Sequence, residues 1–442
     1  MAEGGVRVVD SRIVLATVNI GIQTWGSEGD IRPFLALGHA LTQRGHRVEM
    51  LYTEIGERRY EGVADALGFR AGAIASPVVA DPEKLHQIGL DAIYARDQLQ
   101  QGLIICKRLL EPVTPQIYEA GLELARRSDL LVHHFIVHAA RAAADQAGMP
   151  AISVAFAHML SESRYIHPSG LPRLGEWGNV IGWKLARLAM NQTLLKDVNR
   201  FRKQVGLPVF RDLMTEGWPS HRLHLIASSP ALLDRRPADW PEWMQMCGFL
   251  SLPSHPHETL ATDVEDFLSS GPPPVFMGFG SLMPLAGTQR FDEALAIFTG
   301  AARRSRHRAI IQADVDRPTT SDLVFVRRTP HARVFPRCAA VVHHAGAGTT
   351  HTTLRAGVPS VPVPHVSDQF AWSDELHRLG VAANPLKRTK LTVEALAARI
   401  QETAGNQRMK AAAESIQRRM GDDDGPRTAA EMINRVMGWN KN

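Results

Sequence analysis

The chain alternates between short apolar runs and segments in which apolar residues recur every three or four positions. The runs have the length of strands buried on both faces, and the segments between them have the period of amphipathic helices. This pattern predicts strands at 13–18, 48–52, 130–134, 151–156 and 223–227, and then at 275–278, 309–312, 323–326, 339–342 and 360–363. Helices are predicted at 31–44 and 139–147, between the later strands, and three times after residue 391.

Alternation of this kind predicts parallel sheets covered by helices on both faces. Between residues 229 and 257 the composition changes to proline, tryptophan and polar residues, as in a linker. A length of 442 residues also exceeds what one core usually serves. We therefore expect an α/β protein with two facing, Rossmann-like doubly wound domains, at 1–230 and 258–442, joined by a linker at 231–257. Strand ends from both domains are expected to line the cleft between them.

The composition of the chain indicates a globular protein rather than a membrane-spanning or disulfide-rich one. With 44% hydrophobic and 21% charged residues, the chain has the composition of a globular protein. No apolar run approaches the ~20 residues of a membrane-spanning helix, and the start of the chain lacks the charged and apolar regions of a signal peptide. We expect a cytoplasmic protein without a transmembrane segment. Cys106, Cys247 and Cys338 are widely spaced and odd in number, which indicates buried thiols rather than disulfides or a zinc site.

The net charge of +5 raises the question of an anionic partner. Arginines are scattered through both halves, and no basic stripe with interleaved aromatic residues is present, so nucleic-acid binding is not expected. The charge suits a nucleotide donor or loose contact with an anionic membrane. It is equally the charge that a solvated, arginine-rich surface would carry.

The stretch AAVVHHAGAGTTHTT at 339–353 passes from an apolar run through two histidines and small residues into a helical pattern. Gly346 and Gly348 allow the backbone to approach a ligand closely, and the amides that open the next helix point at an anion. This predicts a diphosphate-binding site, although many doubly wound proteins make such a turn for packing alone.

Polar side chains follow the next predicted strand. Ser367, Asp368 and Gln369 come directly after PSVPVP at 359–364. In a parallel sheet, the carboxyl ends of the strands form the edge that binds ligands. These side chains are therefore expected close to the diphosphate site.

Six motifs resemble those of family 1 glycosyltransferases, the family that includes bacterial antibiotic and macrolide glycosyltransferases and the sterol glucosyltransferases. They are GSEGDIRPFLAL at 26–37, VFMGFGS at 275–281, TPHARVFPRC at 329–338, HHAGAGTT at 343–350, LRAGVPSVPVP at 354–364 and SDQFAWSDELHRLGVA at 367–382. The resemblance covers nearly the whole chain and is weakest at about 77–123 and 158–183. It implies the glycosyltransferase B (GT-B) fold and an inverting hexosyltransferase that uses a UDP- or dTDP-linked sugar.

The resemblance also implies where the catalytic base lies. Family members carry His or Asp in the loop that faces the acceptor, and Asp30 takes that position, although Asp there is also a good N-cap. In relatives with a histidine base, an aspartate at the end of a later strand orients the imidazole, and His134 matches that place. Either Asp30 is the base, or His134 is the base and Asp30 orients it. An unperturbed His, with a pKa of about 6.5, suits base work near neutrality better than Asp at about 3.9.

For the donor, the resemblance implies contacts to the phosphates and to the sugar. The phosphate contacts are His344, the backbone of Gly346 and Gly348, and the hydroxyls of Ser281, Thr349 and Thr350. Asp368 and Gln369 would contact sugar hydroxyls, a role compatible with capping the next helix. The adjacent histidines have no second cluster at ligand spacing, so no metal, and no cofactor beyond the nucleotide sugar, is expected.

Two departures from the family pattern concern the nucleoside. Thr352 stands where many UDP-sugar enzymes carry a glutamate that binds the ribose, which leaves dTDP donors open. Arg333 stands near the place of a tryptophan that lies under the base in plant relatives. We expect the backbone around His331 to contact the base edge instead.

The acceptor is the least defined part. Segments 77–106 and 158–183 are where relatives vary most, and Tyr165, Trp177 and Trp183 are candidates for an apolar acceptor pocket, although such aromatics are also often local core. We expect a hydrophobic natural product of secondary metabolism with a hydroxyl, such as a macrolide, polyketide, sterol or glycolipid. Two alternatives stay open: a noncatalytic relative that activates a true glycosyltransferase, and a sugar-nucleotide epimerase.

Overall fold

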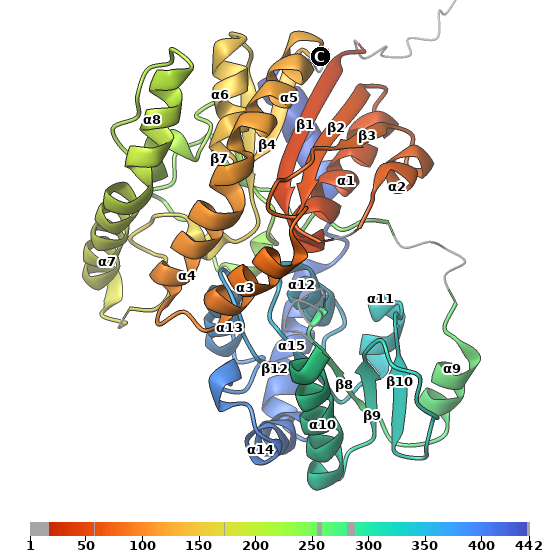
Figure 1. Ribbon diagram of the computed structural model, residues 1–442. Coiled ribbons are helices and arrows are strands. Elements are labelled where there is room, and N and C mark those ends of the chain that lie inside the picture. Colours follow the sequence, from red (N-terminus) through yellow and green to blue (C-terminus); the bar gives the residue numbers. More distant parts are fainter. Residues whose placement is uncertain (1–16, 57, 172, 254–258, 281–287, 440–442) are drawn as a thin grey trace, which may run out of the picture.

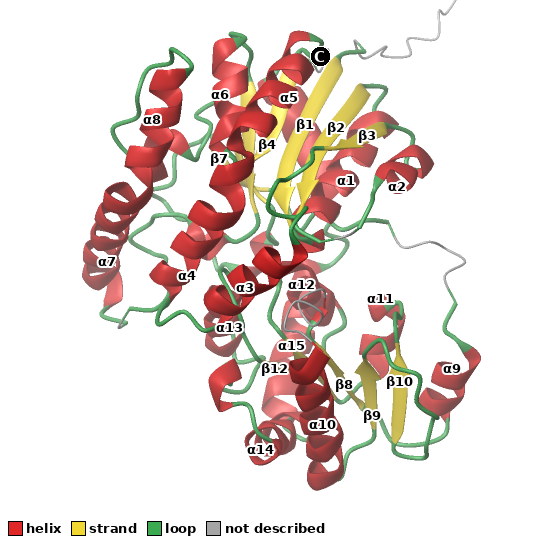
Figure 2. Ribbon diagram, viewed as in Figure 1, coloured by secondary structure: helices red, strands yellow, loops and turns green. Residues whose placement is uncertain are grey.

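The computed structural model describes residues 17–56, 58–171, 173–253, 259–280 and 288–439. Two parallel sheets, one in each half of the chain, form its frame (Figures 1 and 2). Ser281 and most of the predicted strand at 13–18 lie outside the described residues.

The first sheet has seven strands in the order β3-β2-β1-β4-β5-β6-β7, and the second has five in the order β10-β9-β8-β11-β12. All neighbouring strands are parallel. The first sheet consists of β1 (Asn19–Gly26), β2 (Arg47–Glu54), β3 (Arg70–Ala73), β4 (Leu130–His134), β5 (Ala151–Ala155), β6 (His224–Ile226) and β7 (Met244–Met246). The second consists of β8 (Val275–Gly278), β9 (Ala309–Gln312), β10 (Leu323–Val326), β11 (Ala340–His343) and β12 (Ser360–Pro362).

Helices surround both sheets. In the first half they are α1 (Glu28–Gln43), α2 (Glu61–Ala66), α3 (Pro82–Ile93), α4 (Gln98–Ile105), α5 (Thr114–Arg126), α6 (His138–Gln146), α7 (Gly175–Met190) and α8 (Lys196–Gln204). In the second half they are α9 (Thr262–Ser269), α10 (Thr288–Ser305), α11 (His331–Val334), α12 (Ala347–Arg355), α13 (Gln369–Arg378), α14 (Val393–Ala404), α15 (Gln407–Met420) and α16 (Gly425–Val436). Separate buried clusters cover the two faces of the first sheet, one with α1 and one with α5 and α6. Two further clusters do the same for the second sheet.

The strand order reverses once in each sheet, between β1 and β4 and between β8 and β11. At such a switch point the loops after the two strands diverge and leave a crevice for a ligand. Loops from both switch points line one cleft of about 2810 Å³ between the two halves. The expected α/β fold, with two facing doubly wound domains and a cleft, is confirmed.

Each predicted strand from 48–52 onward coincides with a described strand to within two residues at either end, whereas β1, β3 and β7 were not predicted. Strand β1 at Asn19–Gly26 was not predicted, because glycine and polar residues interrupt the apolar pattern of its sequence, NIGIQTWG. Buried Gln23 donates from Nε2 to the carbonyl of Ile117 at 2.7 Å. A Cβ on Gly21 would lie 2.8 Å from Cγ of Leu124, so a helix packs directly on the strand there. These contacts make the polar and glycine positions suitable for the centre of a sheet.

The end of the chain returns to the first domain. Helix α16 packs against α1, where Arg44 contacts Glu431 at 2.6 Å and His46 contacts Asn434 at 3.0 Å. Within the predicted linker, β7 adds a strand to the first sheet. The domain boundaries at 230 and 258 stay a prediction. Among the described helices, none is long and apolar enough to cross a membrane.

Candidate functional site

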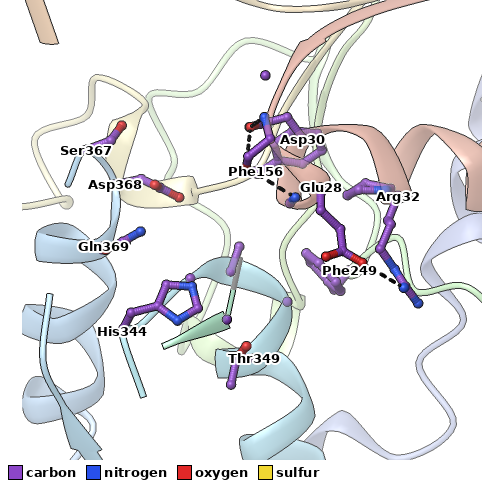
Figure 3. Close-up of a pocket in the computed structure, with 18 of the residues that line it drawn as sticks. Glu28, Asp30, Arg32, Phe156, Phe249, His344, Thr349, Ser367, Asp368 and Gln369 are labelled. Atoms are coloured by element: carbon purple, nitrogen blue, oxygen red, sulfur yellow. Dashed lines mark hydrogen bonds and ion pairs between the residues drawn. The ribbon is translucent and has the colours of Figure 1, made fainter. Parts of the chain in front are cut away.

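Asp30 and His134 meet at the first switch point. Asp30 lies in the first turn of α1, whose N-cap is Ser27, so Asp30 itself is the third helical residue of a capping box and not the N-cap. Its Oδ2 accepts hydrogen bonds from the amide of Ser27 at 2.8 Å and from its hydroxyl at 3.0 Å (Figure 3). Its Oδ1 lies 3.6 Å from Nε2 of His134, at the end of β4. About a third of the Asp30 side chain stays exposed to the cleft, whereas that of His134 is buried.

The hydrogen bonds of His134 fix its orientation. Its Nδ1 accepts a hydrogen bond from the amide of Ile136 at 3.3 Å, so in the neutral imidazole the proton is on Nε2. That proton faces Asp30. The carboxylate is therefore the member of the pair that is free to receive a proton from a third group in the cleft.

His344 follows β11 at the second switch point. A Cβ on Gly280 would lie 2.9 Å from its Cε1, and one on Gly346 would lie 2.4 Å from its Nε2. The two glycines thus make room for the imidazole itself. Burial, with a smaller contribution from His331, lowers the pKa of His344 to about 4, so the ring is neutral at neutral pH and has one N–H with which to donate a hydrogen bond. Its Nδ1 has no hydrogen-bond partner among the described residues.

Helix α12 begins at Ala347, three residues after His344. Its N-cap, Gly346, has no side chain with which to cap the first amides, and the turn lines the cleft. The positive end of a helix that is open in this way attracts an anion. Thr349 and Gly348 also line the cleft, whereas the side chain of Thr350 is fully buried and lies outside the lining. A phosphate contact from the Thr350 hydroxyl is therefore not supported.

Asp368 and Gln369 lie after β12, across the cleft from Asp30 (Figure 3). Burial, together with the charge of Asp30, raises the pKa of Asp368 to about 7. Asp368 holds the N-cap position of α13, but its side chain makes no capping hydrogen bond. Oε1 of Gln369 accepts from the amides of His365 at 2.9 Å and Val366 at 3.1 Å, and its amide nitrogen points into the cleft. One carboxyl and one amide donor thus face the space in front of His344.

The region expected to contact the base lies at the cleft margin. His331 is held by its contact with Gln312, at 2.7 Å, and stacks on Phe335 with ring centroids 4.6 Å apart. Burial lowers the pKa of His331 to about 4. Thr352 lines the cleft, but its hydroxyl donates to the carbonyl of Gly348 at 2.9 Å. This position of α12 therefore provides no carboxylate to bind ribose hydroxyls.

A largely apolar wall of the cleft comes from the first domain. Of the three predicted acceptor residues, Trp183 lines the cleft, whereas Tyr165 and Trp177 lie outside the lining and are partly to mostly exposed. Their segment does approach the cleft, but these two side chains point elsewhere. Further apolar lining residues, which were not singled out from the sequence, include Trp25, Ile105, Phe135, Met159, Met190, Met214 and Trp218. Ile105 and Met159 lie in the two segments expected to form the acceptor pocket, and Phe135 directly follows His134, so the sequence did carry a signal for these three.

The side chain of Gln101 joins the first-domain side of the cleft to the second-domain side. Gln101, buried in α4, donates to the carbonyl of His365 at 3.1 Å and accepts from the amide of Ser367 at 2.6 Å. Ser367 has a φ of 55°, a left-handed conformation that is costly for a residue with a side chain. Gln101 therefore helps to hold the strained turn that presents Asp368.

The cysteines are free, with Cys247 and Cys338 buried and Cys106 partly exposed. Burial raises the pKa of Cys106 and of Cys338 to about 12. Among the residues with described positions, no group of three His, Cys, Asp or Glu side chains could hold a metal ion. The groups that line the cleft can bind an anion, hydrogen-bond a polar ring and take up a proton.

Known proteins match the chain over most of its length. Residues 309–436 match the C-terminal domain model of erythromycin biosynthesis protein CIII-like proteins. O-mycaminosyltylonolide 6-deoxyallosyltransferase of Streptomyces fradiae is 29% identical over 94% of this chain and 97% of its own length. A sterol 3-beta-glucosyltransferase of Arabidopsis thaliana is 28% identical over 87% of this chain, which spans 62% of that plant protein.

Solved structures show the same fold. The glycotransferase of kitacinnamycin superposes with a TM-score of 0.67 at 17% identity, covering 96% of this chain and 99% of that one. The glycosyltransferase VinC, solved in complex with dTDP, has a TM-score of 0.62 at 20% identity, covering 96% of this chain and all of its own. The architecture is therefore that of the GT-B fold.

Proposed function

We propose that this chain, which has the GT-B fold and resembles macrolide and sterol glycosyltransferases over most of its length, is a glycosyltransferase that moves a sugar from a nucleotide diphosphate to a hydroxyl of a hydrophobic natural product. The acceptor class is a macrolide, polyketide, sterol or glycolipid. The observation that carries this proposal is the pairing of Asp30 and His134 at one switch point with His344, the α12 N-terminus and Asp368 at the other. One cleft holds a proton acceptor on its first side and an anion site on its second.

The proposed reaction is one inverting displacement. Asp30 takes the proton of the acceptor hydroxyl, and the oxygen forms a bond to the anomeric carbon as the bond from that carbon to the diphosphate breaks. His134 orients Asp30 through Nε2 and does not itself take the proton, because Nδ1 already accepts from Ile136. The electron pair of the broken bond leaves with the nucleoside diphosphate. His344, Thr349 and the α12 amides stabilise that charge as it develops.

A deoxythymidine donor fits the described residues better than a uridine donor. A ribose presents two hydroxyls, for which a carboxylate is the matching acceptor, and this chain has Thr352 with its hydroxyl already bound to Gly348. A deoxyribose presents one ring hydroxyl fewer. VinC, whose solved complex contains dTDP, is consistent with this choice.

Thermal unfolding with nucleotides tests the proposed function. A ligand present at 100 times its Kd stabilises the folded protein by about 2.7 kcal/mol. We expect dTDP to raise Tm by several degrees, UDP by less, and GDP not at all. Absence of any shift, with or without a sugar on the nucleotide, would contradict donor binding. A shift without transfer to any acceptor would favour an activator, and conversion of the donor alone would favour an epimerase.

The donor affinity should depend on pH through Asp368. Since burial and Asp30 raise the pKa of this carboxyl to about 7, it is protonated at pH 6 and ionised at pH 8. The ionised form accepts hydrogen bonds from two sugar hydroxyls, so the Kd of the nucleotide sugar should fall about tenfold as the pH rises from 6 to 8. Asp368→Asn should bind weakly at both pH values. Titration by calorimetry measures this, and an unchanged pH profile in Asp368→Asn would remove Asp368 from the sugar site.

A further inference from the structure

The outer face of α7 carries an exposed apolar stripe. Leu174, Trp177, Ile181, Leu185 and Leu188 are each more than half exposed. Their spacing of three or four residues places them on one side of the helix, over a length of about 21 Å. Figure 1 shows α7 at the outer edge of the first domain. Single exposed apolar residues are ordinary, but five along one face form a continuous apolar surface of the kind that marks an interaction site.

The inner face of the same helix is firmly packed. Trp183 is buried, and its Nε1 donates to the carbonyl of Ile166 at 2.8 Å. A Cβ on Gly182 would lie 2.7 Å from Cγ of Pro168, so the loop before the helix packs directly on it. Trp183, Ala186 and Met190 line the cleft. Helix α7 is thus fixed in place with one face toward the cleft and the apolar stripe toward solvent.

Positive charge gathers on and beside this helix. Residues 171–203 contain seven lysines and arginines against two acidic residues, an excess that equals the +5 of the whole chain. Arg187, Arg200 and Arg202 pair with acidic side chains. Arg173, Lys184, Lys196 and Lys203 are exposed, and no partner for them is found among the described residues. Of the two acidic residues, Glu176 lies 3.8 Å from Arg164, and Asp197 contacts Arg200.

We propose that the apolar stripe of α7 docks the protein on an anionic lipid surface. Leu and Trp side chains would enter the boundary between headgroups and acyl chains, and the free lysines would contact lipid phosphates. A second copy of the chain fits this surface less well, because pairing through α7 would bring together two segments that each carry an excess of five positive charges. An anionic bilayer compensates that charge instead.

The position of α7 suggests how docking would assist the enzyme, and this step of the inference rests on the proposed function. The helix that contacts lipid on its outer face forms part of the apolar cleft wall on its inner face. A hydrophobic acceptor that leaves the bilayer would have a short path to the cleft along this helix. Docking therefore concerns delivery of the acceptor and leaves the chemistry of the sugar transfer unchanged.

Vesicle flotation of the full chain tests the docking. The protein should float with vesicles of phosphatidylcholine and phosphatidylglycerol and not with phosphatidylcholine alone, and 0.5 M salt should release it. The variant Ile181→Gln, Leu185→Gln, Leu188→Gln, which keeps good helix formers, should lower the partition coefficient at least about tenfold. The double variant Lys184→Glu, Lys196→Glu should lower the partition coefficient by a similar factor. Val63→Ser with Val209→Ser, two exposed apolar residues on other elements, should leave flotation unchanged.

The outcomes separate docking from catalysis. With a water-dispersed acceptor, the glutamine variant should transfer sugar at the rate of the unmodified protein, and with an acceptor embedded in anionic vesicles it should be at least about tenfold slower. Flotation that survives both α7 variants would overturn the proposal. So would a dimer in sedimentation that only the glutamine variant dissociates, since the stripe would then belong to a second copy. Failure of the unmodified protein to bind a nucleotide would contradict the proposed function, but it would not affect the flotation test of docking.

Discussion

Replacing Asp30 with asparagine is expected to lower kcat by about 10²- to 10⁴-fold while the Kd of the nucleotide sugar stays within about twofold. Asparagine keeps an oxygen for the amide of Ser27, so the capping box survives in part, but it cannot take a proton from the acceptor. The measurement is single-turnover transfer together with donor titration. His134→Ala should also reduce kcat, by less than Asp30→Asn, because His134 orients the carboxylate and does not receive the proton.

Ser27→Ala is the matched control for this prediction. It removes the hydroxyl that bonds Asp30 at 3.0 Å and the amide of Gly29 at 3.3 Å, and with it the cap of α1. The free energy of unfolding should fall by about 1 kcal/mol, as for other N-caps, with kcat within a few-fold of normal. If Asp30→Asn behaves like Ser27→Ala, with lower stability and nearly normal turnover, Asp30 serves only as part of the capping box, and His134 becomes the base.

The second large effect is expected at His344. Its replacement by alanine removes a neutral hydrogen-bond donor from the place where the leaving diphosphate gains charge, which should lower kcat by about 10²- to 10³-fold and also weaken dTDP binding. Because burial lowers the pKa of His344 to about 4, the effect should be the same from pH 6 to pH 9. Steady-state kinetics at several pH values, with dTDP competition, would show this.

Two neighbouring threonines give a control within one turn of α12. Thr349 lines the cleft and Thr350 is buried outside the lining, so Thr349→Val should weaken dTDP binding and Thr350→Val should not. Gly346→Ala offers an independent check, since its methyl group would lie 2.4 Å from Nε2 of His344 and displace the ring. Normal donor affinity and turnover in His344→Ala would show that the imidazole only fills the space between the glycines.

The sequence was sufficient for features encoded by neighbouring residues. The strands at 275–278 and 323–326 were predicted at both ends, because each is a short run of apolar residues and glycine. The HHAGAGTT turn and the Ser367–Asp368–Gln369 sequence likewise carry their own signals, and the fold places both on the cleft. Their roles, with those of Asp30 and His134, stay predictions until they are measured.

Features that arise from distant contacts could not be predicted in this way. In the sequence, Gln101 is only one polar residue within a predicted-variable segment. Its role becomes visible when α4 packs against the turn at Ser367, because its amide then joins the two sides of the cleft. Trp177 is a large aromatic residue of the kind that lines apolar pockets, yet it lies on the face of α7 that is turned to solvent. Strand β1 could not be predicted because the polar side chain of Gln23 is suited to burial only when the carbonyl of Ile117 supplies an acceptor.

The return of α16 to the first domain limits how enzymes of this architecture can be recombined. A chimera made by exchanging everything after residue 258 would bring a foreign α16 against α1, the helix that begins beside Asp30. The contacts of Arg44 with Glu431 and of His46 with Asn434 would then be made between unrelated sequences. A donor module that can be exchanged intact therefore ends before Gly425, and α16 is better kept with the acceptor module, although it follows the donor module in the chain.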